Sequence, residues 1–358
     1  MTALLTPRAD PLGVRARSRA AGGRILFLAL LLVLSTIVCV GIGPLVIAPG
    51  TVLAVVLHHL GLPVPATWSP ALDSIVWDVR VPRVLLGAAV GAGLAVSGAA
   101  LQAMVRNLLA DPYVLGVSGG ASTGAAAAIL LGAGSAALGQ YAQSVLAFAG
   151  ALGSALLVLA ISRAGGVVTS LRLLIAGVAI GYALSAVTNL MIFSSDSAEG
   201  SRSVMFWMLG SLALARWDAF LLVVAVAVAG ASLALTACSG VLDALGAGDE
   251  TATALGIDAA RARIALLIGV SLCTAAAVAA SGSIGFVGLV VPHLARRLVG
   301  AAHARLVPAA ALLGALFLLW ADVLSRVVLQ PRELPIGVIT AIIGAPFLLA
   351  LVRRHLAR

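Results

Sequence analysis

The sequence SGSIGFVGLVVPHLARR (residues 281–297) is an apolar stretch that is broken at several points. Glycines stand at 282, 285 and 288, and a proline stands at 292. A regular helix needs roughly 20 apolar residues to cross a bilayer, so a stretch of this length with these interruptions does not form an ordinary anchor. Broken backbone at membrane depth is tolerated only where protein or a water-filled cavity covers its polar groups. The stretch therefore predicts a protein that moves something across a membrane.

The rest of the chain has the composition of a membrane protein. Of its 358 residues, 62% are hydrophobic and 10% are charged, whereas charged residues make up about a quarter of a soluble domain. Together with a short element at 286–296, the apolar windows predict an all-α polytopic protein of about ten transmembrane helices. These windows are 25–45, 84–104, 114–136, 144–161, 171–193, 219–237, 264–280, 306–328 and 336–352. No linker divides them, so residues 25–358 are predicted to form one transmembrane domain, preceded by a disordered cytoplasmic tail at 1–24.

The arginines predict the orientation. An even number of helices puts both ends of the chain on one side, and an excess of basic residues in short loops marks the cytoplasmic side. The chain has 22 basic residues, all of them arginines, and six fall on the opposite side: Arg80, Arg83, Arg202, Arg216, Arg326 and Arg332. Both termini are therefore predicted to be cytoplasmic in a multi-pass protein of the cytoplasmic (inner) membrane. This distribution explains the net charge of +9 without a nucleic-acid partner.

Helices two to five would begin outside and helices seven to ten inside, which is the arrangement of an inverted repeat. The sequence carries only a weak echo between these halves, so the repeat is a hypothesis. Cys39, Cys238 and Cys273 stand at spacings that fit neither a zinc site nor a disulfide framework, and they are interpreted as packing residues.

The chain lacks the residues that would let it use ATP itself. It contains no lysine, which excludes a P-loop, because that motif needs a lysine to reach the phosphates. Its acidic residues fall in loops or near the ends of the apolar windows, which disfavours the relay of intramembrane acids typical of a stand-alone secondary transporter. A partner must supply the energy.

The inside loop 239–263 is the predicted docking site for that partner. It reads SGVLDALGAGDETATALGIDAARAR and predicts a short helix at 249–255 that begins with two acids and is broken by Gly256. Acids in the first turn and a glycine at the end are typical helix signals. A second helix is predicted to begin at Asp258.

Several further motifs make the chain resemble the FecCD-type permease subunits of binding-protein-dependent ABC importers for iron siderophores, haem and cobalamin. The resemblance covers about residues 25 to 355. Within this family, the chain is similar to the cobalamin importer permease. The motifs, in order, are RVPR (80–83), SGAALQAMVRNLLADPYVLGVSGGAS (97–122), RLLIAGVAIG (172–181), FWMLGSL (206–212), TALGI (253–257), GSIGFVGLVVPHLARRLVG (282–300), ADVLSR (321–326) and ELPIGVITAIIGAPF (333–347).

The resemblance implies a type II ABC importer permease fold with ten helices. It implies a subunit that is not an enzyme, holds no cofactor or metal, and pairs with a second permease copy or a paralogue. Two ATPase subunits would bind below and a soluble substrate-binding protein above. The predicted cargo is a metal chelate, with a ferric siderophore as the leading candidate. Haem or cobalamin remains the alternative within the family, and a secondary transporter or channel the alternative outside it.

The resemblance also implies roles for particular residues. Arginines of the outer motifs would face outward and pair with acids of the binding protein: Arg80, Arg83 and Arg326. The alternative for them is a long side chain that reaches the membrane interface. The ATPase-coupling element would consist of Gly248, Asp249, Glu250, Ala254, Leu255 and Gly256. The cytoplasmic gate is assigned to Ser170 and Leu171. In this arrangement, the broken stretch 281–297 is interpreted as a short packed element that joins the ATPase-facing side to the pathway wall.

Overall fold

The computed structural model describes residues 14–163 and 169–356, and within them every regular element is helical. The first half contains α1 (Val14–Gly41), α2 (Pro49–His59), α3 (Pro70–Ser74), η1 (Ile75–Arg80), α4 (Val81–Val105), η2 (Pro112–Leu115), α5 (Val117–Leu131), α6 (Ser135–Leu138), η3 (Gly139–Tyr141), α7 (Ala142–Arg163) and α8 (Ser170–Phe193). The second half contains α9 (Ala198–Met208), α10 (Ala219–Ala237), α11 (Ser239–Ala247), α12 (Asp249–Ala254), α13 (Ala259–Ser281), α14 (Val287–Val299), α15 (His303–Val327) and α16 (Ile336–Leu356).

Each of the ten predicted membrane elements coincides with one helix of this set, namely α1, α4, α5, α7, α8, α10, α13, α14, α15 and α16. Within the described residues, seven helical segments are long and apolar enough to cross a membrane by length and composition, and Val117–Leu131 and Ile336–Leu351 are shorter apolar helices. Helix α14 has 13 residues, which gives it a length of about 20 Å. The hydrocarbon core is about 30 Å thick, so α14 alone does not cross it.

The predicted boundary of the N-terminal tail is wrong. Helix α1 begins at Val14, so residues 14–24 belong to the first helix and not to a disordered segment. Arginine and alanine are good helix formers, and the segment contains no proline, so the helix continues into the apolar run in spite of Gly22 and Gly23. The rest of the predicted tail, residues 1–13, lies outside the described residues.

The helices differ strongly in burial. In the segment Pro70–Val105, which contains α4, 78% of the apolar window is buried, and in α13 and α15 the value is 67%. The windows of α1, α7, α8 and α10 are only 22 to 28% buried. Helix α4 packs against both α13 and α15, so these three helices form the centre of the subunit.

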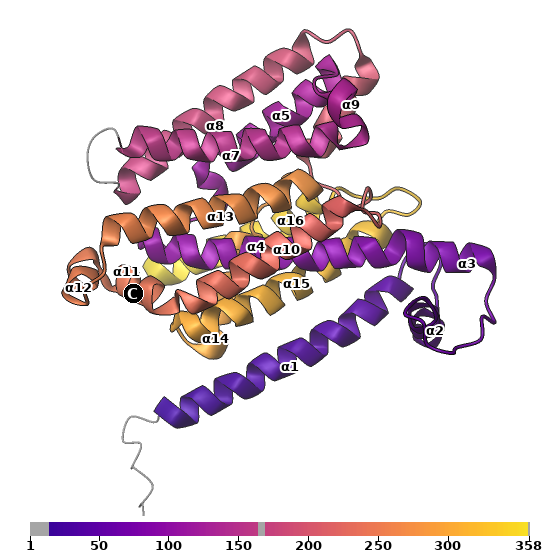
Figure 1. The fold of residues 1–358 in the computed structure, drawn as a ribbon, viewed down its shortest axis with the longest axis horizontal. Helices are drawn as coiled ribbons and strands as arrows, with labels where there is room; N and C mark the ends of the chain where they lie inside the picture. The colour runs from indigo at the N-terminus through magenta and orange to yellow at the C-terminus, as the bar shows by residue number, and fades with distance from the viewer. Residues whose placement is uncertain (1–13, 164–168, 357–358) are drawn as a thin grey trace, which may run out of the picture.

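The bundle has two distinct ends (Figure 1). Helices α11 and α12 lie at the left end with the C-terminus, and we refer to this as the α12 end. Helices α2 and α3 lie at the right end, which we refer to as the α2 end. Helices α5, α7 and α8 form a layer above the central helices in this view, and α1 runs along the opposite side.

The packing pairs of the two halves correspond. Helix α4 packs on α14 and α15, and α13 packs on α5 and α7. Helix α5 packs on α7 and α8, as α14 packs on α15 and α16. Each helix of the first set (α4, α5, α7 and α8) therefore has packing neighbours that correspond to those of its counterpart in the second set (α13, α14, α15 and α16). An inverted repeat predicts this correspondence.

Helices α4 and α14 approach closely because glycines face each other. A Cβ atom added to Gly98 would lie 1.9 Å from the carbonyl oxygen of Gly288. Small residues permit such close approach between transmembrane helices.

The structure corrects one expectation about the stretch 281–297. Helix α13 ends at Ser281 and residues 282–286 are not in a regular helix, but Gly288 and Pro292 lie inside α14. Because proline has no N–H, it cannot donate to the carbonyl four residues earlier. That carbonyl, on Gly288, instead accepts a 3.3 Å hydrogen bond from Nε2 of Gln102 on α4. A side chain from another helix thus allows the helix to continue through the proline.

We expect Gly98→Ala to destabilise the protein by about 1–3 kcal/mol, because the new methyl group has no space against Gly288. The measurement is the midpoint of thermal unfolding in detergent. Gly269→Ala in α13 is the matched control, since its Cβ would meet no atom within 4 Å. It should leave the midpoint unchanged or raise it slightly. Equal midpoints for wild type and Gly98→Ala would contradict the close approach.

Candidate functional site

A groove of about 630 Å³ opens on the face of the bundle that carries α8. Helix α8 contributes Gly177, Tyr182 and Ser185 to its lining, and η2 contributes Tyr113. Gly285 and Phe286 come from the segment that precedes α14. The broken stretch therefore contributes to a cavity wall as well as to packing.

The two half-length helices α5 and α14 begin close together beside this groove. The hydroxyl of Tyr113 donates to the carbonyl of Ile284 at 3.0 Å and accepts from its N–H at 2.8 Å. Two hydroxyl groups, of Ser118 and Ser283, lie 2.7 Å apart. These bonds bind the irregular backbone before α14 to the beginning of α5. Irregular backbone that lines a cavity near the junction of two repeats is typical of transporter pathways.

The chain before α5 is also fixed locally. The carboxylate of Asp111 accepts a 2.9 Å hydrogen bond from the N–H of Tyr113 and so caps η2. Gly116 follows with φ of 73°, a conformation that favours glycine and turns the chain into α5.

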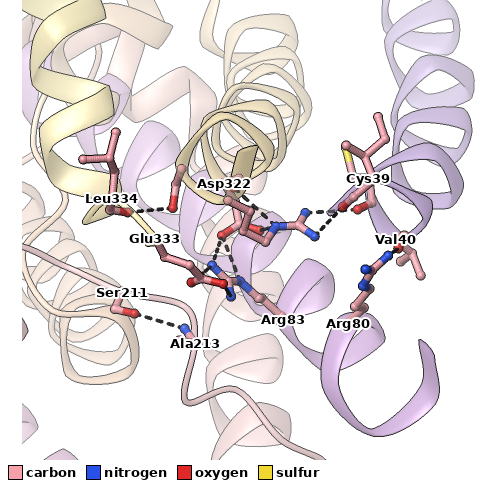
Figure 2. A network of polar contacts seen from close by, with 12 residues as sticks. Cys39, Val40, Arg80, Arg83, Ser211, Ala213, Asp322, Glu333 and Leu334 are labelled. Carbon is pink, nitrogen blue, oxygen red and sulfur yellow. Dashed lines mark hydrogen bonds and ion pairs between the residues drawn. The ribbon is translucent and has the colours of Figure 1, made fainter. Parts of the chain in front are cut away.

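A network of charged side chains lies at the α2 end (Figure 2). Arg83 makes a bidentate interaction with the carboxylate of Glu333, with nitrogen–oxygen distances of 3.1 and 2.9 Å. Its Nε and Nη2 also lie 3.0 and 2.9 Å from Oδ1 of Asp322. The second oxygen of Asp322 lies 3.0 Å from Nε of Arg326. One buried carboxylate is therefore shared by two guanidinium groups.

The remaining donors of the arginines bind the end of α1. Arg80 donates to the carbonyls of Val40, Gly41 and Leu45 at 2.9, 3.1 and 2.6 Å. Arg326 donates to the carbonyls of Ile42 and Cys39 at 2.7 and 3.0 Å. The last carbonyls of a helix have no intrahelical partner, and the C-terminal end carries partial negative charge. The two arginines therefore supply both the hydrogen bonds and the charge that this helix end needs.

This geometry changes the orientation expected for the predicted docking arginines. Arg80, Arg83 and Arg326 are 6%, 7% and 3% exposed, so they do not face outward, because their donors bind carboxylates and carbonyls within the chain. The other three arginines assigned to this side are exposed: Arg202, Arg216 and Arg332. A second cavity at this end has a volume of about 680 Å³. Its lining includes the buried Arg83, the exposed Arg202, and Glu333.

The α12 end contains the predicted coupling segment. The predicted helix 249–255 is observed as α12, with Asp249 and Glu250 in its first turn, and Gly256 follows with φ of 78°. Helix α13 begins after Asp258, whose carboxylate caps it. Helix α11 within this loop was not predicted.

The six predicted coupling residues differ in exposure. Glu250, Ala254, Leu255 and Gly256 are exposed, and Leu255 is 66% exposed although it is apolar. Gly248 is buried, and Asp249 is bound to Arg263, with 2.7 Å between Oδ1 and Nη2.

The bond from the Arg263 guanidinium lowers the pKa of the Asp249 carboxyl. A carboxylate whose pKa is lower in the folded state contributes its stabilisation above the unfolded pKa and loses it as the pH falls through the folded value. The Asp249 carboxyl is therefore ionised at neutral pH and accepts the bond from Arg263.

The predicted gate residues lie at the start of α8. Ser170 is the first residue of this helix, and the side chain of Thr169 caps it by accepting from the N–H of Arg172. Leu171 is 65% exposed. The preceding residues 164–168 lie outside the described residues. Within the described part of the chain, no group of three or more His, Cys, Asp or Glu side chains is placed to hold a metal ion.

The FecCD transport family matches residues 30–354. The chain belongs to the FecCD family. As a FecCD permease it is 40% identical to the cobalamin import system permease protein of Halobacterium salinarum over 371 aligned residues, which cover 95% of this chain and 96% of the relative. It is 39% identical to the Fe(3+)-citrate import system permease protein of Bacillus subtilis, covering 82% of this chain and 90% of the relative. A solved inward-facing metal-chelate type ABC transporter matches it with a TM-score of 0.79 at 34% identity, covering 93% of this chain and 99% of that chain.

Membership confirms the resemblance predicted from the motifs and the all-α permease fold. This FecCD permease is a multi-pass membrane subunit of an ABC importer for metal chelates, and it is not itself an enzyme. The family implies ATPase and binding-protein partners.

Sequence reasoning missed three residues of this FecCD permease that hold its ends together. Asp322 and Glu333 stand in the ADVLSR and ELPIG motifs but were not singled out, and Arg263 was counted only as a topological charge. A signal was present for the acids, because each motif places an acid within a few residues of a predicted outer helix end.

We expect Arg326→Ala to destabilise the FecCD permease by about 3–5 kcal/mol, because removing one member of a buried ion pair leaves its partner charge poorly compensated. The carbonyls at the end of α1 would also lose their donors. Thermal unfolding in detergent measures the effect. Arg332→Ala, at an exposed arginine of the same end, should change stability by no more than about 0.5 kcal/mol. Equal effects of the two variants would show that burial of Arg326 contributes nothing.

Proposed function

We propose that this chain is the permease of a binding-protein-dependent ABC importer whose cargo is a ferric siderophore. The observation that carries the proposal is the groove beside the meeting point of α5 and α14, in a chain similar to permeases named for cobalamin and ferric citrate import. Both of those cargoes are metal chelates. Cobalamin is the second candidate, because the relative named for it matches 95% of this chain.

We further propose an orientation and an assembly. The α12 end, with both termini, faces the cytoplasm and binds two ATPase subunits in the complete importer, while the α2 end faces the binding protein. A second permease copy or a paralogue covers the face of α8. The support is that α8 leaves large apolar side chains uncovered, with Tyr182 at 76% and Phe193 at 87% exposure. Lipid covers the other exposed apolar helices.

Helix α12 is proposed as the coupling element. Its exposed residues Glu250, Ala254, Leu255 and Gly256 would enter a groove on the ATPase, while Gly248 and Asp249 fix the segment to the permease. Ser170 and Leu171, at the same end of the bundle, would form the cytoplasmic gate. Closure of the ATPase pair would move these elements and open the pathway alternately to each side.

We propose that docking at the α2 end uses two layers of arginines. The exposed Arg202, Arg216 and Arg332 make direct contact with acids of the binding protein. The predicted docking residues Arg80, Arg83 and Arg326 lie beneath them and hold the surface in shape. For Arg83 to contact a partner directly, Glu333 would have to leave it, and Glu333 is able to exchange because its side chain is 42% exposed.

Transport tests the function. The permease, the ATPase and the binding protein encoded by neighbouring genes are reconstituted in proteoliposomes, and uptake of a ferric siderophore, haem and cobalamin is compared with and without ATP. We expect ATP-dependent uptake of the ferric siderophore. Preferential uptake of cobalamin would identify cobalamin as the cargo and would leave the assignment as an ABC importer unchanged. Uptake by the permease alone, independent of ATP, would overturn the importer and favour a secondary transporter or channel.

The same system tests the coupling element. Leu255→Asp should weaken ATPase binding by about tenfold, as loss of an apolar contact at the centre of an interface does. Leu60→Asp is the matched control, because Leu60 is equally exposed at 66% but lies at the α2 end. It should leave ATPase binding unchanged. Equal ATPase binding by Leu255→Asp and wild type would refute the role of α12.

Docking is tested by the association rate of the binding protein at low and high salt. Arg332→Glu should slow association several-fold at low salt and reduce its salt dependence, because exposed charges steer encounter and are screened by ions. Arg83→Gln, in a variant shown to be folded, should leave the rate within about twofold. A larger loss for Arg83→Gln would assign the direct contact to Arg83 after release from Glu333.

A further inference from the structure

Arg263 connects three separate elements at the α12 end. It stands in the first turns of α13 and is 4% exposed. Its Nη2 binds Oδ1 of Asp249, the first residue of α12, at 2.7 Å. Its Nε donates to the carbonyl of Met104 near the end of α4 at 3.2 Å. One guanidinium group thus binds α12 and α4 from a position on α13.

The segment that carries Asp249 is attached firmly to the same region. Ala252 of α12 and Leu242 and Leu245 of α11 are fully buried in one cluster with Met104. The junction between α11 and α12 lies beside α4 as well, since a Cβ on Gly248 would come 3.6 Å from Nη1 of Arg106. Helix α12 therefore has an attached side, which packs on α11 and α13, and an exposed side, which carries Leu255.

Helix α4 extends from this point to the other end of the molecule. It has 25 residues, a length of about 38 Å at 1.5 Å per residue. Near the α2 end it carries Arg83, which binds Asp322 and Glu333. In between, Gln102 binds the carbonyl of Gly288 in α14. It belongs to the most buried membrane segment, so a displacement at one end has little room to be absorbed locally.

We propose that Arg263 is the positioning residue that transmits movement of α12 to α4, and that α4 carries it to the charged network at the α2 end. The proposal rests on the proposed function, because it takes α12 as the contact with the ATPase. Its physical basis is that a planar guanidinium holds two acceptors in fixed directions at once. A lysine keeps the charge but not this fixed fork, so it would bind Asp249 without holding Met104 in the same geometry.

The test measures ATP hydrolysis and chelate uptake in the same proteoliposomes of the full importer. Arg263→Lys and Asp249→Ala should each assemble with the ATPase and hydrolyse ATP within about twofold of wild type, while uptake per ATP hydrolysed falls at least about fivefold. The double variant should be no worse than the more affected single variant, because both changes break one connection. A purely structural role would instead lower assembly, hydrolysis and uptake together.

Arg261→Ala is the matched control. Arg261 lies two residues away on the same helix, is 90% exposed and pairs with Asp258. Its uptake per ATP should equal that of wild type. An unchanged ratio in both Arg263→Lys and Asp249→Ala, or an equal fall in Arg261→Ala, would overturn the proposal. Failure of the proposed function is distinguishable, since wild type would then show no ATP-dependent uptake.

Discussion

Backbone carbonyls at helix ends and breaks lack an intrahelical donor, and in this permease several of them bind side chains of other helices. Arg80 and Arg326 bind the end of α1, Arg263 binds the end of α4, and Gln102 binds the carbonyl that Pro292 leaves free. Each donor is distant in sequence from its acceptor. Local irregularity in one helix is thereby converted into a specific contact between two helices.

The choice of arginine over lysine follows from this constraint. A guanidinium has five donors in a rigid plane and keeps its charge when buried, whereas a lysine ammonium is a single point that loses its charge more readily. Arg83 uses three nitrogens on two carboxylates, and Arg326 uses three on one carboxylate and two carbonyls. A chain with 22 basic residues and no lysine can therefore place several of them inside the bundle without leaving donors unmatched.

Hydropathy was sufficient to predict the ten membrane elements, because an apolar run favours a membrane helix locally. Failures occurred where a distant residue decides the outcome. Pro292 stays inside α14 because Gln102 is nearby in space, which no local pattern reveals. Arg83 was grouped with Arg80 and Arg326 from the sequence, but its partners were not identified, because they lie 239 and 250 residues away. Exposure of a charged residue is thus the property that the sequence predicts least well.

The distribution of burial explains how such a subunit can be both fixed and mobile. The central helices α4, α13 and α15 are largely enclosed, and their close contacts at glycines leave little freedom for independent movement. Helix α8, by contrast, is held along one side only, and its other side borders the groove or remains uncovered. Packed cores move as units because their interdigitated contacts resist continuous deformation. A force applied at α12 would accordingly shift the central helices together. Helices α5 and α14 and η2 pack on these central helices and border the groove, so its shape would change without any helix unfolding in the membrane.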